Sequence, residues 1–158
     1  MRDIMQQLTV AFFGHRQTEN FAEVESKLEQ TVTELLRGET FVEFLVGRNG
    51  EFDTLAASVV RRVVKRMDTA NASLTLVLPY STAEFLSNEK SFLDYYDTVE
   101  ICEQSAKAHY RSAITVRNRY MADRADIIIC CIQRKSGGAW AAVSYALRQG
   151  KRIVRTNE

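Results

Sequence analysis

The sequence has few of the residues that mark disulfide-rich, zinc-binding or membrane-spanning proteins. It contains three cysteines and two histidines, with no Cys-x-x-Cys pair, so we expect neither a disulfide framework nor a metal site. No apolar run approaches the roughly 20 residues that cross a bilayer, and the first residues lack the apolar segment of a secretory signal peptide. These absences predict a cytoplasmic protein.

The sequence also lacks an excess of charge of either sign. Lysine and arginine number 21 and aspartate and glutamate 20, which leaves a formal net charge of +1. A chain so balanced exerts no overall attraction on nucleic acid or on an anionic membrane, and we expect neither as a partner. Its 158 residues, 46% of them hydrophobic, suffice for one folded domain with a substantial core.

Short apolar runs alternate with amphipathic stretches along the chain, and the only proline, Pro79, ends one of the runs. Residues expected to form strands are 8–13, 41–46, 74–78, 98–102, 127–132 and 152–154. Helical spacing of apolar residues covers 20–37, 52–67, 104–124 (one helix or a pair) and 138–148. The alternation predicts an α/β fold, a single-domain Rossmann-like three-layer sandwich over residues 1–158 with a mostly parallel sheet.

Two further segments carry local predictions. Residues 81–97 are polar, acidic and aromatic without a clear period, and we expect a mobile loop or short lid there. Cys130 and Cys131 lie inside an apolar run, so we expect small core residues on opposite sides of a strand.

Three clusters of small residues follow predicted strands, where folds of this class bind ligands. A strand, a small-residue turn and a helix leave free backbone N–H groups at the helix N-terminus, where an anion binds readily. The first cluster is Gly14, His15 and Arg16. Gly14 permits a tight turn, Arg16 offers a planar set of donors for phosphate or carboxylate, and His15 suits hydrogen bonding or acid–base chemistry. A plain surface turn is the alternative.

The second cluster runs from Gly47 to Asp53. Gly47 and Gly50 would let backbone approach a phosphate. Asp53 has two interpretations that the sequence leaves open, a helix N-cap or an acceptor for a ribose hydroxyl. Arg48 lies between the glycines.

The third cluster is Ser136, Gly137 and Gly138, followed by Trp140, which would stack on a base or pack internally. Its spacing matches neither the G-x-G-x-x-G fingerprint nor a Walker A loop, which disfavours NAD(P)-dependent hydride transfer and P-loop ATP hydrolysis. Upstream, Asn118 is a versatile hydrogen-bonding residue flanked by two arginines. Arg117 and Arg119 cannot point in the same direction from one helix, so we expect one of them at the pocket and the other in solvent.

Taken together, these motifs resemble the SLOG superfamily, the Rossmann-like group that includes the DprA DNA-processing proteins and the LOG cytokinin-activating enzymes. Within it, the chain is most similar to small bacterial YpsA-like, DUF1273-type proteins. The resemblance covers nearly the whole chain and rests on four stretches: Phe13-Gly14-His15-Arg16, Gly47 to Asp53 with Thr54-Leu55-Ala56, Arg117-Asn118 with Met121, and Gly137-Gly138 with Tyr145-Ala146.

The resemblance implies a small-molecule partner, a nucleotide or a derivative such as ADP-ribose, and no particular cofactor beyond it. It assigns to the pocket Gly14, His15, Arg16, Gly47, Gly50, Asp53, Asn118, Gly137 and Gly138. Two residues depart from the family pattern: Arg48 replaces a small residue, and Ala139 replaces a threonine. Arg48 would then supply a charge-assisted contact. The resemblance is also compatible with a homodimer.

We interpret the chain as a nucleotide-binding sensor or regulatory module rather than an enzyme. The alternative is an N-glycosidase or nucleoside 2-deoxyribosyltransferase-like enzyme, because residues 126–151 are similar to those enzymes too. Its candidate acids are Glu51, Asp53, Glu84 and Asp94. LOG-type phosphoribohydrolases carry P-G-G-x-G-T-x-x-E, and this chain lacks that proline and glutamate, so their reaction is unsupported. A DprA-like binder of single-stranded DNA is disfavoured by the balanced charge and the lack of an aromatic-basic stripe.

Overall fold

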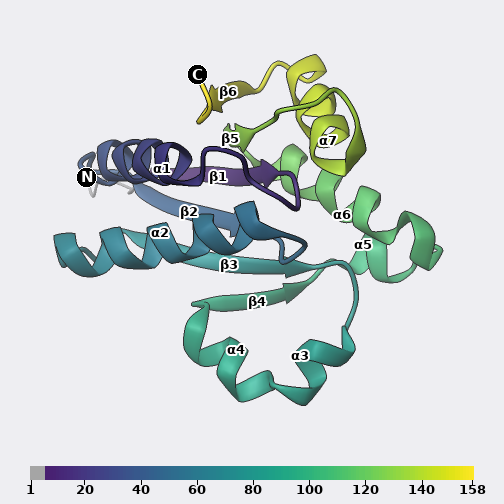
Figure 1. The fold of residues 1–158 in the computed structure, drawn as a ribbon. Helices are drawn as coiled ribbons and strands as arrows, with labels where there is room; N and C mark the ends of the chain where they lie inside the picture. Colours follow the sequence, from purple (N-terminus) through teal and green to yellow (C-terminus); the bar gives the residue numbers. More distant parts are fainter. Residues whose placement is uncertain (1–5) are drawn as a thin grey trace.

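The protein is built around one six-stranded, all-parallel sheet, which the computed structural model shows within the described residues, 6–158 (Figure 1). The strands are β1 (Gln7–Gly14), β2 (Phe41–Val46), β3 (Ala72–Leu78), β4 (Thr98–Ile101), β5 (Ile127–Cys131) and β6 (Arg152–Arg155). Their spatial order is β4-β3-β2-β1-β5-β6. The chain therefore winds outward from β1 in one direction and restarts beside β1 with β5, which makes a topological switch point between these two strands.

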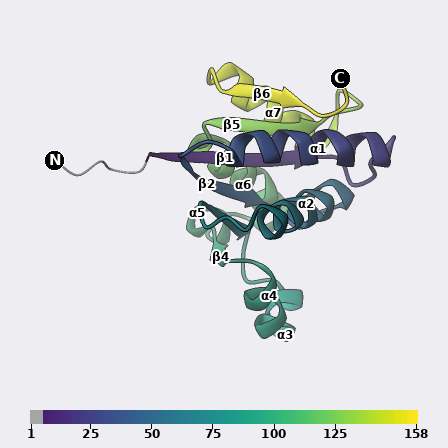
Figure 2. The same ribbon diagram turned by 90° about the vertical axis from the view of Figure 1, so that its left-hand side faces the viewer.

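Helices cover both faces of the sheet, as the two views show (Figures 1 and 2). They are α1 (Phe21–Leu36), α2 (Glu51–Met67), α3 (Ala83–Ser87), α4 (Glu89–Tyr95), α5 (Glu103–Ala106), α6 (Tyr110–Arg124) and α7 (Gly137–Arg148). Helices α1 and α2 pack side by side on one face, and α6 and α7 pack together on the other. The predicted Rossmann-like fold is confirmed, and most element boundaries fall within two residues of those expected.

The alternating side chains of the central strand separate the core into two layers. Val10 and Phe12 of β1 pack in the layer beneath α1 and α2, while Ala11 and Phe13 pack in the layer beneath α6 and α7. This alternation follows from the two-residue period of a strand. Of the vicinal cysteines, Cys130 belongs to the second layer and Cys131 to the first, with both thiols buried; the prediction for this pair is confirmed.

The expected mobile loop at residues 81–97 is wrong, because most of this segment is helical. Helix α3 begins after Thr82, whose hydroxyl oxygen accepts a hydrogen bond from the backbone N–H of Phe85 at 3.1 Å. Phe92 and Tyr96 are buried in the α1/α2 layer of the core. Sequence periodicity missed α3 and α4 because helices of five and seven residues are too short to show a stripe.

At the end of β1, Gly14 occupies a position with no room for a side chain. A Cβ atom built on it would lie 2.2 Å from Cγ of the fully buried Phe52 ring, at the start of α2. The missing side chain thus lets the first turn of α2 press against the carboxyl end of β1. This contact sets the distance between the first two clusters of small residues.

We expect Gly14→Ala to lower the free energy of unfolding by about 1–3 kcal/mol, because the new methyl group overpacks the core. Gly38→Ala is the matched control, since the nearest atom to its Cβ would lie 3.6 Å away; its effect should stay below about 0.5 kcal/mol. Urea denaturation measures both. Equal losses in the two variants would contradict the close contact at Gly14.

Candidate functional site

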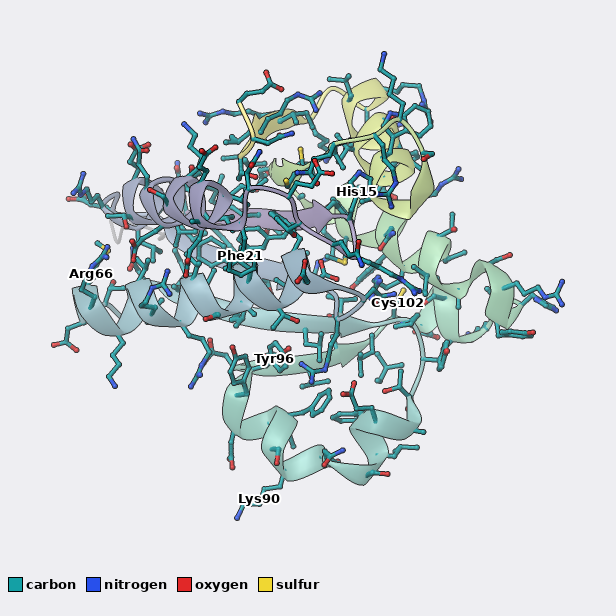
Figure 3. All side chains as sticks on the ribbon, viewed as in Figure 1. His15, Phe21, Arg66, Lys90, Tyr96 and Cys102 are labelled. Carbon is teal, nitrogen blue, oxygen red and sulfur yellow. The ribbon has the colours of Figure 1, made fainter. Side chains whose placement is uncertain are left out.

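A cavity of about 260 Å³ opens where the carboxyl ends of β1, β2 and β5 meet the start of α7 and the middle of α6. It is lined by Phe12, Phe13, Gly14, His15, Arg16, Gly47, Asn49, Asp53, Ile114, Arg117, Asn118, Met121, Arg134, Gly137, Gly138 and Ala139. Figure 3 shows His15 at this end of the sheet and Arg66 at the opposite end. The cavity therefore lies at the topological switch point, where ligands bind in open α/β sheets.

The structure brings together eight of the eleven residues that the sequence analysis assigned to a pocket. Those that line the cavity are Gly14, His15, Arg16, Gly47, Asp53, Asn118, Gly137 and Gly138. Arg48, Gly50 and Ser136 do not line it. Binding of a ligand by the eight stays a prediction.

Arg48 points away from the cavity, toward partners on and next to α3 and α4. Its guanidinium donates to both carboxylate oxygens of Glu84, at 3.0 and 3.2 Å, and to the hydroxyl of Tyr96 at 3.2 Å. It also lies over the Phe92 ring, 4.8 Å from the centroid. The sequence could not reveal this, because these partners belong to the segment around α3 and α4 that was expected to be a loop.

Gly50 and Ser136 lie outside the cavity lining. A Cβ atom on Gly50 would come within 2.5 Å of the Cα atom of Arg16, so Gly50 allows the two loops to touch. Ser136 is the N-cap residue of α7, is exposed, and makes no capping hydrogen bond with its side chain.

The dominant charge in the cavity is Arg117, which is only 2% exposed. Its guanidinium donates to the backbone carbonyl of Val77 at 2.8 Å and to Oδ1 of Asn118 at 3.0 Å. Burial lowers the pKa of Arg117, although the nearby Asp53 opposes this. Within residues 6–158, no carboxylate lies at ion-pair distance from it. Burial of a cation whose nearby carboxylate, Asp53, is not at ion-pair distance is costly, and this favours an anionic ligand beside Arg117.

Arg119 points the other way. Its guanidinium lies over the Tyr145 ring, 5.1 Å from the centroid, and the residue is exposed. The prediction that one of the two arginines reaches the pocket and the other stays in solvent is confirmed, with Arg117 as the inner residue. Gly47 leaves space for it, because a Cβ atom there would lie 3.0–3.1 Å from the guanidinium atoms.

Asn49 connects Arg117 to Asp53. Its Oδ1 accepts a hydrogen bond from Nη2 of Arg117 at 3.4 Å, and its backbone N–H donates to Oδ2 of Asp53 at 2.9 Å. Burial raises the pKa of Asp53, while the Asn49 N–H and the Arg117 charge favour the carboxylate. The N-cap of α2 is Gly50, so the N-cap interpretation of Asp53 is wrong.

His15 holds the third loop against the first. Its side chain is 5% exposed, and Nε2 accepts a hydrogen bond from the backbone N–H of Arg134 at 3.4 Å. Burial lowers the pKa of His15, and the Arg134 charge lowers it further. A neutral ring is therefore favoured, and a neutral ring is what can accept this bond.

The N-termini of α2 and α7 at the cavity differ in the hydrogen-bond partners of their backbone N–H groups. At α2, the Glu51 N–H donates to the carbonyl of Arg16 at 2.9 Å and the Asn49 N–H to Asp53, so protein atoms occupy these donors. Helix α7 has no side-chain cap, and its first three residues, Gly137 to Ala139, line the cavity. The first-turn amides of α7 are thus available to bind an anion.

Of the four candidate acids, only Asp53 lines the cavity. Glu51 accepts from the backbone N–H of Thr18 at 2.7 Å, Glu84 pairs with Arg48, and Asp94 is exposed on α4. Glycoside chemistry generally uses two carboxylates, and among the described residues these four do not form such a pair.

Several residues that line the cavity were not predicted from the sequence. Asn49 stood inside the second cluster, Ile114 and Arg134 flank named motifs, and Phe12 and Phe13 belong to the first strand. Asn49 could have been predicted from the sequence, because a side-chain amide between two glycines at a strand end is typical of a hydrogen-bonding loop.

No family model matches this sequence, and a comparison with curated proteins found no match. Among solved structures, DprA from Streptococcus pneumoniae superposes with a TM-score of 0.65 at 17% identity, over 94% of this chain and 50% of that one. DprA from Helicobacter pylori does so with a TM-score of 0.63 at 15% identity, over 94% and 64%. The chain has the Rossmann-like fold of DprA. It spans about half to two thirds of the length of these proteins, and its similarity to YpsA-like, DUF1273-type proteins stays a prediction.

The comparison corrects the expectation that nucleic acid is not a partner. Helicobacter pylori DprA, which shares this fold, binds single-stranded DNA. The expectation had relied on the net charge, which does not show how unevenly the charged residues are distributed along the sequence. Residues 104–155 contain eleven lysines and arginines against two acidic residues, while residues 1–103 contain ten against seventeen.

The structure also bears on membrane association. Within residues 6–158, no helix combines the length and the apolar character that crossing a bilayer would require.

We expect Asp53 to give stability an unusual pH dependence. Because its pKa is raised above 3.8 in the folded state, the native protein binds this proton more tightly than the unfolded chain does. The contribution of Asp53 to stability should therefore fall as pH rises through that native pKa, by about 1.4 kcal/mol for each tenfold difference in proton affinity.

Chemical denaturation of the wild type and of Asp53→Asn, from acidic to neutral pH, measures this. The stability of the wild type relative to the variant should decrease as pH rises. Asp94→Asn, on exposed α4, controls for the loss of one negative charge. A difference that grows with pH would contradict the burial of Asp53.

Proposed function

We propose that the chain binds single-stranded nucleic acid and that the cavity receives one of the strand's phosphate groups. The observation that carries the proposal is the buried guanidinium of Arg117, which lines the cavity without a carboxylate at ion-pair distance among the described residues. A phosphate would neutralise this charge and accept charge-assisted hydrogen bonds. The uncapped amides of α7 face the same space.

Exposed groups near the cavity suit the rest of a strand. Arg16 and Arg134 are exposed and line the mouth, where they can contact neighbouring phosphates. Trp140 on α7 and Tyr110 on α6 are 37% and 69% exposed, and aromatic side chains give stacking surfaces to bases. Of the eleven lysines and arginines of residues 104–155, Arg117 and Arg134 line the cavity.

The shared fold adds independent support. Single-stranded DNA is bound by Helicobacter pylori DprA, so this architecture is compatible with such a partner. A lone mononucleotide would use the cavity but leave Trp140 and Tyr110 without a role.

Fluorescence anisotropy with an oligo-dT strand of about 15 nucleotides tests the proposal. We expect saturable binding that weakens steeply with salt. Arg117→Met should bind at least about tenfold more weakly, because it removes hydrogen bonds to a charged group. Arg134→Ala, at an exposed position, should flatten the slope of log affinity against log salt by about 0.7.

Lys90→Ala is the matched control for the loss of a cation, since Figure 3 shows Lys90 on α4, away from His15; it should leave affinity and slope unchanged. Melting temperatures of all variants report whether they fold. Absence of binding by the wild type, or equal displacement of the strand by dTMP and by an unlabelled strand at the same concentration, would overturn the proposal.

A further inference from the structure

We infer that Asp53 makes the cavity selective for the ribose 2′-hydroxyl, so that the preferred ligand is single-stranded RNA rather than DNA. This inference rests on the proposed function and names the ligand class of the same site. The observation behind it is the placement of an acceptor, Asp53, one side chain away from the cation Arg117.

The chain of hydrogen bonds through Asn49 fixes this placement. Asn49 accepts from Arg117 at 3.4 Å through its side chain and donates to Asp53 Oδ2 at 2.9 Å through its backbone. Both charged residues line the cavity. A ligand group that contacts Arg117 thus has Asp53 as a near neighbour.

Asp53 keeps one oxygen for a ligand. Its Oδ2 accepts from Asn49, whereas Oδ1 has no hydrogen-bond partner within residues 6–158. Among the described residues, Thr18 Oγ1 is the one fully buried side-chain oxygen without a partner, so the unpaired Oδ1 of the half-buried Asp53 keeps some exposure. In its ionised form, which the Asn49 N–H and the Arg117 charge favour, this carboxylate can only accept hydrogen bonds, and the ligand must then bring a donor.

Only RNA brings such a donor beside a phosphate. Within a strand, the sugar–phosphate backbone of DNA consists of acceptors alone, and the 2′-hydroxyl is the one backbone donor that RNA adds. The sugar is bonded directly to the phosphate, while the base lies one ring further away. A phosphate held by Arg117 therefore places the sugar closest to Asp53.

With DNA as the ligand, the same carboxylate would weaken binding. Burial already raises the pKa of Asp53, which reflects poor solvation of the carboxylate. A deoxyribose would cover it without supplying a donor, and an unsatisfied charged acceptor is expensive to cover. Discrimination against an analogue that lacks a hydrogen-bonding group is strong where the site's partner group is buried.

The test compares oligo-rU with oligo-dU of equal length, which differ only in the 2′-hydroxyl. We expect the wild type to bind oligo-rU about tenfold more tightly, the worth of one hydrogen bond to a charged group. Asp53→Asn should bring the ratio of the two affinities close to one. Because the readout is a ratio within one protein, a partial loss of folded protein does not imitate the effect.

Asp94→Asn, on α4, should keep the wild-type ratio. Equal affinities of the wild type for the two strands, or tighter binding of oligo-dU, would overturn the inference while leaving the proposed function standing. A preference for oligo-dC over oligo-dU without any rU/dU difference would also overturn it, because Asp53 would then accept from a base amino group. Binding of neither strand would instead overturn the proposed function itself.

Discussion

The site depends on the burial of one arginine side chain under the ends of three strands. Arg117 reaches from α6 to the carbonyl of Val77 on β3 and lies against the backbone of Gly47, where no side chain would fit comfortably. Its remaining contacts, Asn118 and Asn49, come from its own helix and from the loop after β2. One guanidinium thereby ties α6, β3 and the β2–α2 turn together and at the same time supplies the positive charge of the cavity.

The other walls follow from close backbone contacts. Gly14 lets Phe52 and the start of α2 lie against the end of β1, and Gly50 lets the α2 turn touch Arg16. His15 connects this pair of loops to the β5–α7 loop through Arg134. Two of the glycines that looked like phosphate contacts thus act first on the protein itself, by admitting Arg117 and Arg16. Helix α7 has no side-chain cap, so its first-turn amides are available to an anion.

Local charge matters more than total charge for this protein. A net charge of +1 conceals a basic excess in residues 104–155 and an acidic excess in residues 1–103. The cations that line the cavity are Arg16, Arg117 and Arg134. Electrostatic attraction of a strand is governed by charges within about 10 Å, so the sum over the chain was the wrong quantity. The fold shared with Helicobacter pylori DprA, which binds single-stranded DNA, agrees with this local picture.

The strands and helices and their order were predictable from the amino-acid sequence alone. Apolar runs such as Phe41–Val46 and the helical spacing up to Met67 specified strands and helices to within two residues, because local periodicity reflects which side chains must be buried. The same alternation predicted that the strand ends of β1, β2 and β5 would meet. It failed at α3 and α4, where the helices are too short for a period to appear.

Which polar side chains turn into the cavity depends on contacts that form in the folded protein. Arg48 pairs with Glu84 rather than entering the cavity, and Asn49 bridges Arg117 and Asp53. These choices involve partners up to 68 residues apart, which no local pattern encodes. The physical reason is that a charged side chain takes its direction from the long-range balance between desolvation and pairing, and that balance exists only once the sheet and its helices have assembled.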